Sequence, residues 1–71
     1  MEDRELAAVL DRFLGRLKPE ARRLFVRRYW YLSPIREIAG DYGMSESKVK
    51  MSLLRSRGKL KKLLEKEGIT L

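Results

Sequence analysis

Basic side chains are concentrated in one segment near the C-terminal end of the sequence. Positions 48 to 62 contain seven lysine and arginine residues and no aspartate or glutamate. A dense group of cations attracts polyanions through long-range electrostatics and the release of counterions. A run of charge is equally typical of a solvated helix face. The segment by itself therefore leaves nucleic-acid binding and a plain solvated surface as equal alternatives.

The side chains on which many enzymes and most zinc sites depend are missing. The sequence has no cysteine and no histidine, which removes disulfides, the usual zinc ligands, a common nucleophile and the commonest general base. Its aspartates and glutamates are scattered over positions expected to face solvent and form no convergent titratable cluster. We therefore expect no enzymatic activity, no metal and no cofactor.

Length and charge narrow the class of protein further. The 71 residues suffice for one small domain, residues 1–71, and the formal net charge of +7 favours polyanionic partners. No apolar run approaches the roughly 20 residues that cross a bilayer, and the first residues are acidic where a signal peptide is basic. We expect a soluble protein without a membrane partner; cytoplasmic, nucleoid-associated localisation follows only from the function argued below.

Two helices are predicted in the first half of the chain. Apolar residues recur at spacings of three and four from about residue 3 to 16, and again from Pro19 to near Tyr31. Pro19 suits a first helical turn, and Glu20 complements the helix dipole there. The expected apolar positions are Leu6, Val9, Leu10, Phe13 and Leu17, followed by Ala21, Leu24, Phe25 and Tyr29.

Two further helices are predicted in the second half. Ser33 is expected to cap a third helix that starts at Pro34, and Gly43 to end it in the left-handed conformation. Ser45 then caps a fourth helix, which runs to about Lys66. No segment has the alternation of a strand. The sequence thus predicts an all-α fold, a compact four-helix domain with a long last helix.

A helix-turn-helix is predicted over about residues 34–66. This motif needs a small residue where its helices touch, a glycine in the turn and an apolar anchor on the second helix. Ala39, Gly43 and Val49 meet these needs, with Ile38 and Tyr42 at flanking apolar positions. A helical hairpin without DNA-binding function is the alternative, and the charge that follows Val49 favours DNA binding.

The predicted fourth helix divides into three surfaces at about 100° per residue. The residues expected to face the core are Val49, Leu53, Ser56, Leu60, Leu63 and Leu64. Those on the opposite side are Ser47, Met51, Leu54, Gly58 and Lys62. The cations that flank this outer side are Lys48, Lys50, Arg55, Arg57, Lys59 and Lys61. Such a layout suits a helix in the major groove with phosphates on either side.

Position along this helix suggests different roles for its residues. Ser47 and Lys50, near the N-terminal end, are best placed to hydrogen-bond base edges. Met51 and Leu54 are expected to contact thymine methyl groups, or else to be ordinary exposed apolar side chains. Arg57 and the residues after it, Lys61 among them, are expected to touch phosphates or solvent.

The stretch from Leu17 to Leu64 resembles region 4 of the sigma-70 family, especially the extracytoplasmic-function group. The matching segments are Leu17-Lys18-Pro19-Glu20, Arg28-Tyr29-Trp30, Leu32-Ser33, Glu37-Ile38-Ala39, Gly43-Met44-Ser45-Glu46, Val49-Lys50 and Arg55-Ser56-Arg57-Gly58-Lys59-Leu60. The resemblance implies that the fourth helix reads the minus-35 promoter element. The groove-facing positions it implies are Glu46, Ser47, Lys50, Met51, Leu54 and Arg55.

The resemblance also implies partners and a larger protein. The first two helices would bind the flap of the RNA polymerase beta subunit, with Leu14, Phe25 and Trp30 as contact candidates and core packing as the alternative for the aromatics. An anti-sigma factor is a further implied partner. Met51-Ser52 departs from the family's usual Ser-Arg and leaves the base preference open. Complete sigma factors carry an upstream promoter-melting domain, so we expect an excised domain.

Other readings remain open at this point. A LuxR-type regulator shares the Glu-Ile-Ala, Ser-Glu and Val-Lys segments, although Arg28-Tyr29-Trp30 and the long basic tail argue against it. A protein-binding adaptor that never touches DNA would use the same apolar surfaces. A basic helix lying on an anionic membrane is disfavoured because its leucines are needed for the core.

Overall fold

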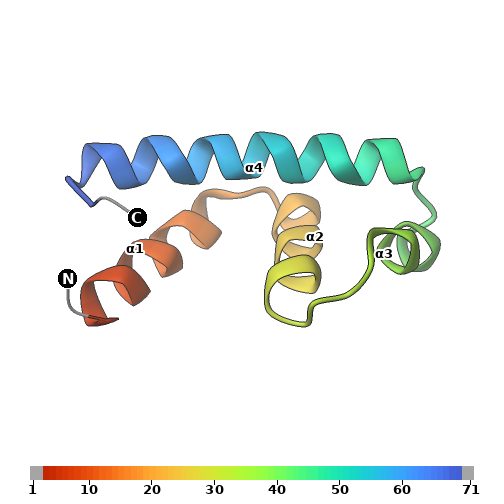
Figure 1. Cartoon of the computed structure of the whole chain (residues 1–71), viewed down its shortest axis with the longest axis horizontal. Helices are drawn as coiled ribbons and strands as arrows, with labels where there is room; N and C mark the ends of the chain where they lie inside the picture. Colours follow the sequence, from red (N-terminus) through yellow and green to blue (C-terminus); the bar gives the residue numbers. More distant parts are fainter. Residues whose placement is uncertain (1–2, 70–71) are drawn as a thin grey trace.

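The computed structural model describes residues 3–69, which form four α-helices and no strand. They are α1 (Asp3–Arg16), α2 (Pro19–Tyr29), α3 (Ile35–Tyr42) and α4 (Glu46–Lys66). Figure 1 shows α4 as one long straight helix, with α1, α2 and α3 following one another along the same side of it. α4 packs against all three, and α2 also packs against α3. The predicted all-α, four-helix fold is confirmed.

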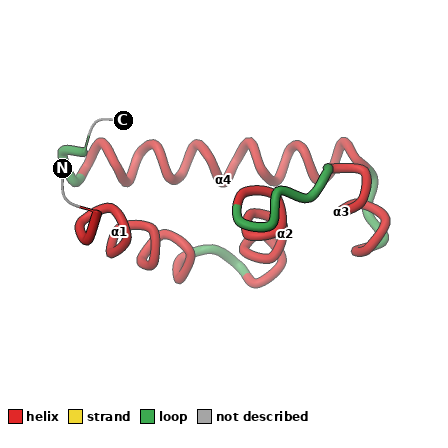
Figure 2. Tube along the Cα trace, turned by 60° about the horizontal axis from the view of Figure 1, so that its bottom comes forward, coloured by secondary structure: helices red, strands yellow, loops and turns green. Residues whose placement is uncertain are grey.

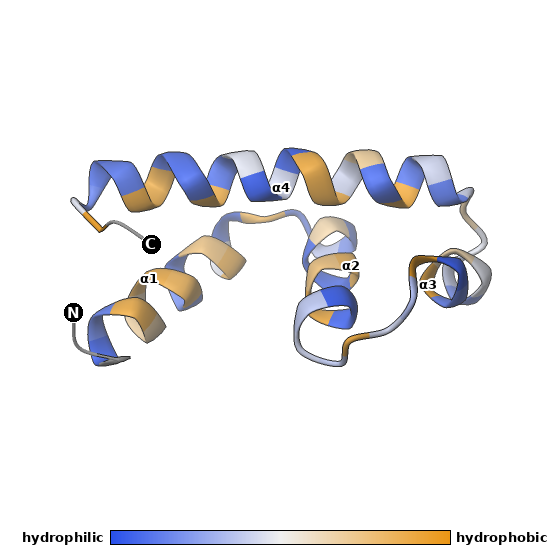
Figure 3. Ribbon diagram, in the orientation of Figure 1, coloured by the Kyte–Doolittle hydropathy of each residue, from blue (hydrophilic) through white to orange (hydrophobic). Residues whose placement is uncertain are grey.

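The core lies between α4 and the three shorter helices. Figure 3 shows apolar residues, in orange, along the side of α4 that faces the three shorter helices. The buried apolar side chains are Val9, Phe13, Leu17, Leu24, Phe25, Ile38, Ala39, Val49, Leu53, Leu63 and Leu64. Phe13 and Phe25 meet edge to face, with ring centroids 5.0 Å apart. This contact joins α1 to α2 in the favoured aromatic geometry.

α2 ends two residues before the predicted end near Tyr31. Its last helical residue is Tyr29, and the N–H groups of Trp30 and Tyr31 both donate to the carbonyl of Val26. The chain then turns at Leu32, which has a left-handed φ of 54°. Apolar periodicity continues through this turn, so the sequence pattern could not reveal where the helix ends.

The predicted capping role of Ser33 is wrong. α3 begins at Ile35, Pro34 occupies the N-cap position, and no side chain caps this end. The Ser33 hydroxyl instead accepts a hydrogen bond from Nε of Arg27 on α2, over 3.2 Å. The Ser33 hydroxyl, which local sequence rules assign to the start of α3, is therefore hydrogen-bonded to a side chain of α2.

Candidate nucleic-acid interface

α3 and α4 meet at a sharp corner that has the predicted helix-turn-helix features. Ala39 and Val49 are buried at the contact, and Gly43 has a left-handed φ of 63°. The N–H of Met44 donates to the carbonyl of Ala39 over 2.9 Å, which closes the end of α3. The Ser45 hydroxyl accepts from the N–H of Lys48 over 3.1 Å and caps α4 as predicted. These contacts define the orientation of α4 relative to α3.

One side of α4 is free of other helices along its whole length. Figures 1 and 2 show α1, α2 and α3 all on the opposite side. The residues predicted to face the core are buried or half-buried, and those predicted to lie opposite are exposed. Met51 and Leu54 are 50% and 53% exposed, a high value for apolar side chains. α4 therefore presents an open face with two apolar residues in its N-terminal half.

Cations line both edges of this open face. The helical spacing of about 100° per residue places Lys48, Arg55 and Lys59 on one edge. It places Lys50, Arg57 and Lys61 on the other edge, and all six side chains are exposed. Glu46 and Ser47 are also exposed and lie at the N-terminal end of α4, beside the α3–α4 corner. This arrangement can bind one row of phosphates on each side of a helix inserted in the major groove.

The edge of α4 that carries Arg55 lies beside the start of α2. A recess there is lined by Lys18, Glu20, Ala21, Ser52, Arg55, Ser56 and Lys59. Lys18 thus adds a positive charge to this edge from the loop between α1 and α2, and Glu20 at the start of α2 places a negative charge in the same recess. The sequence analysis did not assign Lys18 to the interface, because only the packing of α2 on α4 brings the two segments together.

The edge that carries Arg57 lies beside the C-terminal end of α2. Nη1 of Arg57 donates a hydrogen bond to the hydroxyl of Tyr29 over 3.1 Å. Arg57 is exposed, so it remains accessible to an anion. Its side chain is nevertheless directed toward α2, whereas the sequence predicted a role in contacting phosphate or solvent.

An apolar groove of about 340 Å³ opens next to Arg57, between α1, α2 and α4. Its lining residues are Leu10, Phe25, Tyr29, Trp30, Arg57 and Leu60. Trp30 is 51% exposed, whereas Phe25 is only 4% exposed and packs against Phe13, Tyr29 and Trp30. Among the predicted partner contacts, Trp30 therefore offers an open apolar surface and Phe25 forms the floor.

The third predicted contact, Leu14, lies outside this groove. It is half-buried and packs against the core. Leu10, Tyr29 and Leu60 line the groove but were not among the predicted contacts. Their apolar periodicity was visible in the sequence and was assigned to core packing, since periodicity does not separate a residue at the rim of a core from one inside it.

No group of three or more metal-ligating side chains is found within residues 3–69. Over the same residues, no helix is both long and apolar enough to cross a membrane.

The chain matches a known family over most of its length. The model of the family described as sigma-70, region 4, matches residues 7–60, from α1 through most of α4. A search of curated proteins finds no significant match. The matched range includes the α3–α4 corner, most of the open face of α4 and the residues that line the apolar groove. The chain therefore belongs to the sigma-70 region 4 family and is a helix-turn-helix DNA-binding domain of a transcription sigma factor.

Proposed function

We propose that this domain binds the minus-35 element of bacterial promoters through α4 and so contributes to the initiation of transcription. The observation that carries the proposal is the open face of α4, which is bordered by cations on both edges and begins at a capped helix-turn-helix corner. An α-helix with this layout fits the major groove of duplex DNA. The domain would act in the bacterial cytoplasm, where promoter DNA lies, and as a binding module without catalysis.

Binding would start with electrostatic capture of the duplex. The seven cations between positions 48 and 62 give α4 most of the formal net charge of +7 that the chain carries. Their contacts with phosphates would release condensed counterions, so the affinity should fall steeply as salt rises. This capture does not distinguish one sequence from another.

Base readout would come from the N-terminal half of α4. Ser47 and Lys50 lie where a recognition helix contacts base edges, and Glu46 can accept a hydrogen bond from cytosine. Met51 and Leu54 provide exposed apolar surface for thymine methyl groups. Arg55, from its edge of α4, would reach either a base or a phosphate at the groove wall.

The apolar groove would bind the flap of the RNA polymerase beta subunit. Its half-exposed Trp30 and its apolar floor suit the apolar face of an amphipathic helix. The groove and the open face of α4 are different surfaces of the domain, so one domain would bind polymerase and promoter at the same time. An anti-sigma factor that covered this groove would compete with polymerase.

Two experiments test these two halves of the proposal. In the first, duplexes with randomised central positions are selected for binding, and the affinity of the selected duplex is measured at several salt concentrations. Enrichment of one motif and a steep salt dependence are expected. Binding without sequence preference, or no binding, would contradict promoter recognition and favour a protein-binding adaptor.

In the second experiment, the isotopically labelled domain is titrated with the flap-tip segment of a bacterial polymerase and followed by NMR. Saturable shifts at the amides of α1 and α2 around the groove are expected. No shifts at high peptide concentration, combined with selective DNA binding, would contradict flap binding and favour a helix-turn-helix regulator that acts without this polymerase contact.

A further inference from the structure

α3 is a short helix that packs against α2 and α4. Ile38 and Ala39 are its buried residues, and Ile35 is half-buried against the core. Figure 1 shows α3 at the end of α4 farthest from α1. A helix of eight residues has little stability of its own, so its orientation depends on its neighbours.

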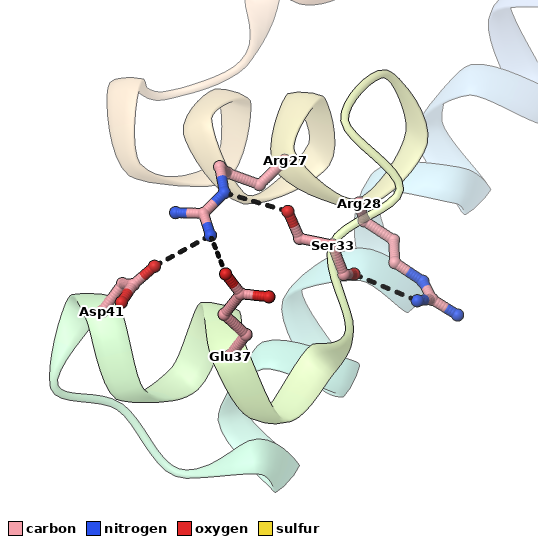
Figure 4. Close-up of polar contacts among 5 residues, drawn as sticks. All are labelled: Arg27, Arg28, Ser33, Glu37 and Asp41. Atoms are coloured by element: carbon pink, nitrogen blue, oxygen red, sulfur yellow. Dashed lines mark hydrogen bonds and ion pairs between the residues drawn. The ribbon is translucent and has the colours of Figure 1, made fainter.

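Arg27 of α2 supplies several polar contacts to α3 and to the loop before it. Its Nη2 lies 2.8 Å from Oδ2 of Asp41 and 3.8 Å from Oε1 of Glu37. Its Nε donates to the hydroxyl of Ser33, and its guanidinium lies 5.8 Å from the centre of the Tyr42 ring. Figure 4 shows the guanidinium between α2 and the two carboxylates of α3. One side chain thus joins α2 to both turns of α3.

The surroundings of Arg27 strengthen this link. Its side chain is only 24% exposed, which limits the screening of its ion pairs by water. The hydrogen bond to Asp41, and then the contact with Tyr42, raise the pKa of Arg27 above its usual value, because both favour its charged form. The neighbouring Arg28 donates from Nη1 to the carbonyl of Ser33 over 3.1 Å and holds the same loop.

We propose that Arg27 is a positioning residue for DNA binding. It links α3 to α2 and thereby fixes the orientation of α3 at the α3–α4 corner, where α4 begins. Its charge also offsets Glu37 and Asp41, the two acidic residues of α3, in a motif whose first helix crosses the DNA backbone. The inference rests on the proposed DNA-binding function, and it assigns a role to a residue that need not touch DNA.

The test compares substitutions that remove the same charge at different places. Arg27→Gln breaks the link between α2 and α3. Arg12→Gln is the matched control, because Arg12 pairs with Glu67 over 2.9 Å and joins α1 to the far end of α4 instead. Arg27→Lys keeps the charge, but its single ammonium group cannot bond Ser33 and Asp41 in the planar geometry of a guanidinium.

Two quantities are measured on each variant of the 71-residue chain: amide hydrogen exchange along α3 and α4, and affinity for the selected duplex at one salt concentration. For Arg27→Gln we expect exchange in α3 to be about tenfold faster and DNA affinity about tenfold lower than for Arg12→Gln, the scale of a lost charge-assisted hydrogen bond. Arg27→Lys should also exchange faster in α3 than the natural chain, with a smaller loss of affinity.

Equal rates of amide exchange in α3 for Arg27→Gln and Arg12→Gln would overturn the proposal. Faster exchange in Arg27→Gln would also overturn it if the two variants bound DNA with equal affinity. If Arg27→Gln does not fold, the same comparison is made with Arg27→Lys. A natural chain that binds no duplex would refute the proposed function. Faster α3 exchange in that case would still show that Arg27 holds α3, which separates the two failures.

Discussion

Arg57 of α4 donates a hydrogen bond over 3.1 Å to the hydroxyl of Tyr29 on α2, at the border between the proposed DNA face and the apolar groove. Arg55, two positions earlier in the same helix, lies on the other edge beside Lys18 and takes part in no ion pair within residues 3–69. The sequence analysis placed both arginines at the DNA interface, Arg55 facing the groove and Arg57 at phosphates or solvent. Their surroundings predict different contributions to DNA binding.

We expect Arg55→Ala to weaken DNA binding and, where Arg55 contacts a phosphate, to lower the slope of log affinity against log salt by about one unit. Arg57→Ala should lower the slope by less, because its guanidinium is already engaged by Tyr29. Fluorescence anisotropy at several salt concentrations measures both slopes. Equal reductions would mean that Arg57 leaves Tyr29 when DNA binds.

Lys50 and Lys61 lie on the same edge of α4 but at different distances from its N-terminal end. We expect Lys50→Ala to change which duplexes are preferred, because Lys50 lies where a recognition helix meets base edges. Lys61→Ala should weaken all duplexes alike, since a phosphate contact carries no base information. Affinities for a set of duplexes with single base-pair changes provide the measurement. Identical effects of the two substitutions on every duplex would contradict base readout by this part of α4.

Gly43 and Gly40 allow the strain in the α3–α4 turn to be measured. Gly43→Ala should lower the free energy of unfolding by about 1–2 kcal/mol, because its left-handed φ of 63° is unfavourable for a residue with a Cβ. No atom lies within 4 Å of the added Cβ at either glycine, so steric clash does not contribute.

The matched change Gly40→Ala should raise the free energy of unfolding by up to about 1 kcal/mol, since Gly40 is inside α3 and alanine favours a helix. Urea unfolding followed by circular dichroism measures both variants. A stabilised Gly43→Ala protein would show that the chain does not turn at this residue.

Leu32 has a left-handed φ of 54° and a side chain that is 76% exposed, so it is strained without burying apolar surface. We expect Leu32→Gly to raise the free energy of unfolding by up to about 1 kcal/mol, the relief of strain less the greater freedom of glycine in the unfolded chain. The control is Tyr31→Gly, at the exposed residue next to Leu32. It should lower the free energy of unfolding, because glycine adds freedom to the unfolded chain and no strain is relieved at this position. Thermal unfolding of the two variants tests this, and a destabilised Leu32→Gly protein would show that the Leu32 side chain stabilises the loop.

Local rules of sequence were enough for most of the fold. The apolar spacing predicted four helices, and the structure confirms α1 at Asp3–Arg16 and α4 ending at Lys66. Ser45 and Gly43 were recognised because an N-cap hydroxyl and a left-handed glycine act on backbone groups a few residues away. The family resemblance is likewise confirmed, because its motifs are continuous segments of sequence. The individual DNA contacts stay predictions.

What sequence reasoning missed depends on contacts between residues far apart in the chain. Ser33 looked like a helix cap, but Arg27 on α2 takes its hydroxyl, and Arg57 bonds to Tyr29 of α2. Likewise, periodicity could not tell the buried Phe25 from the half-exposed Trp30. The sequence alone determined the four helices, the cap at Ser45, the left-handed turn at Gly43, the basic face of α4 and the family. Only the tertiary structure decided which side chains pair across helices and which apolar residues remain open, because both depend on how α2 and α3 pack against α4.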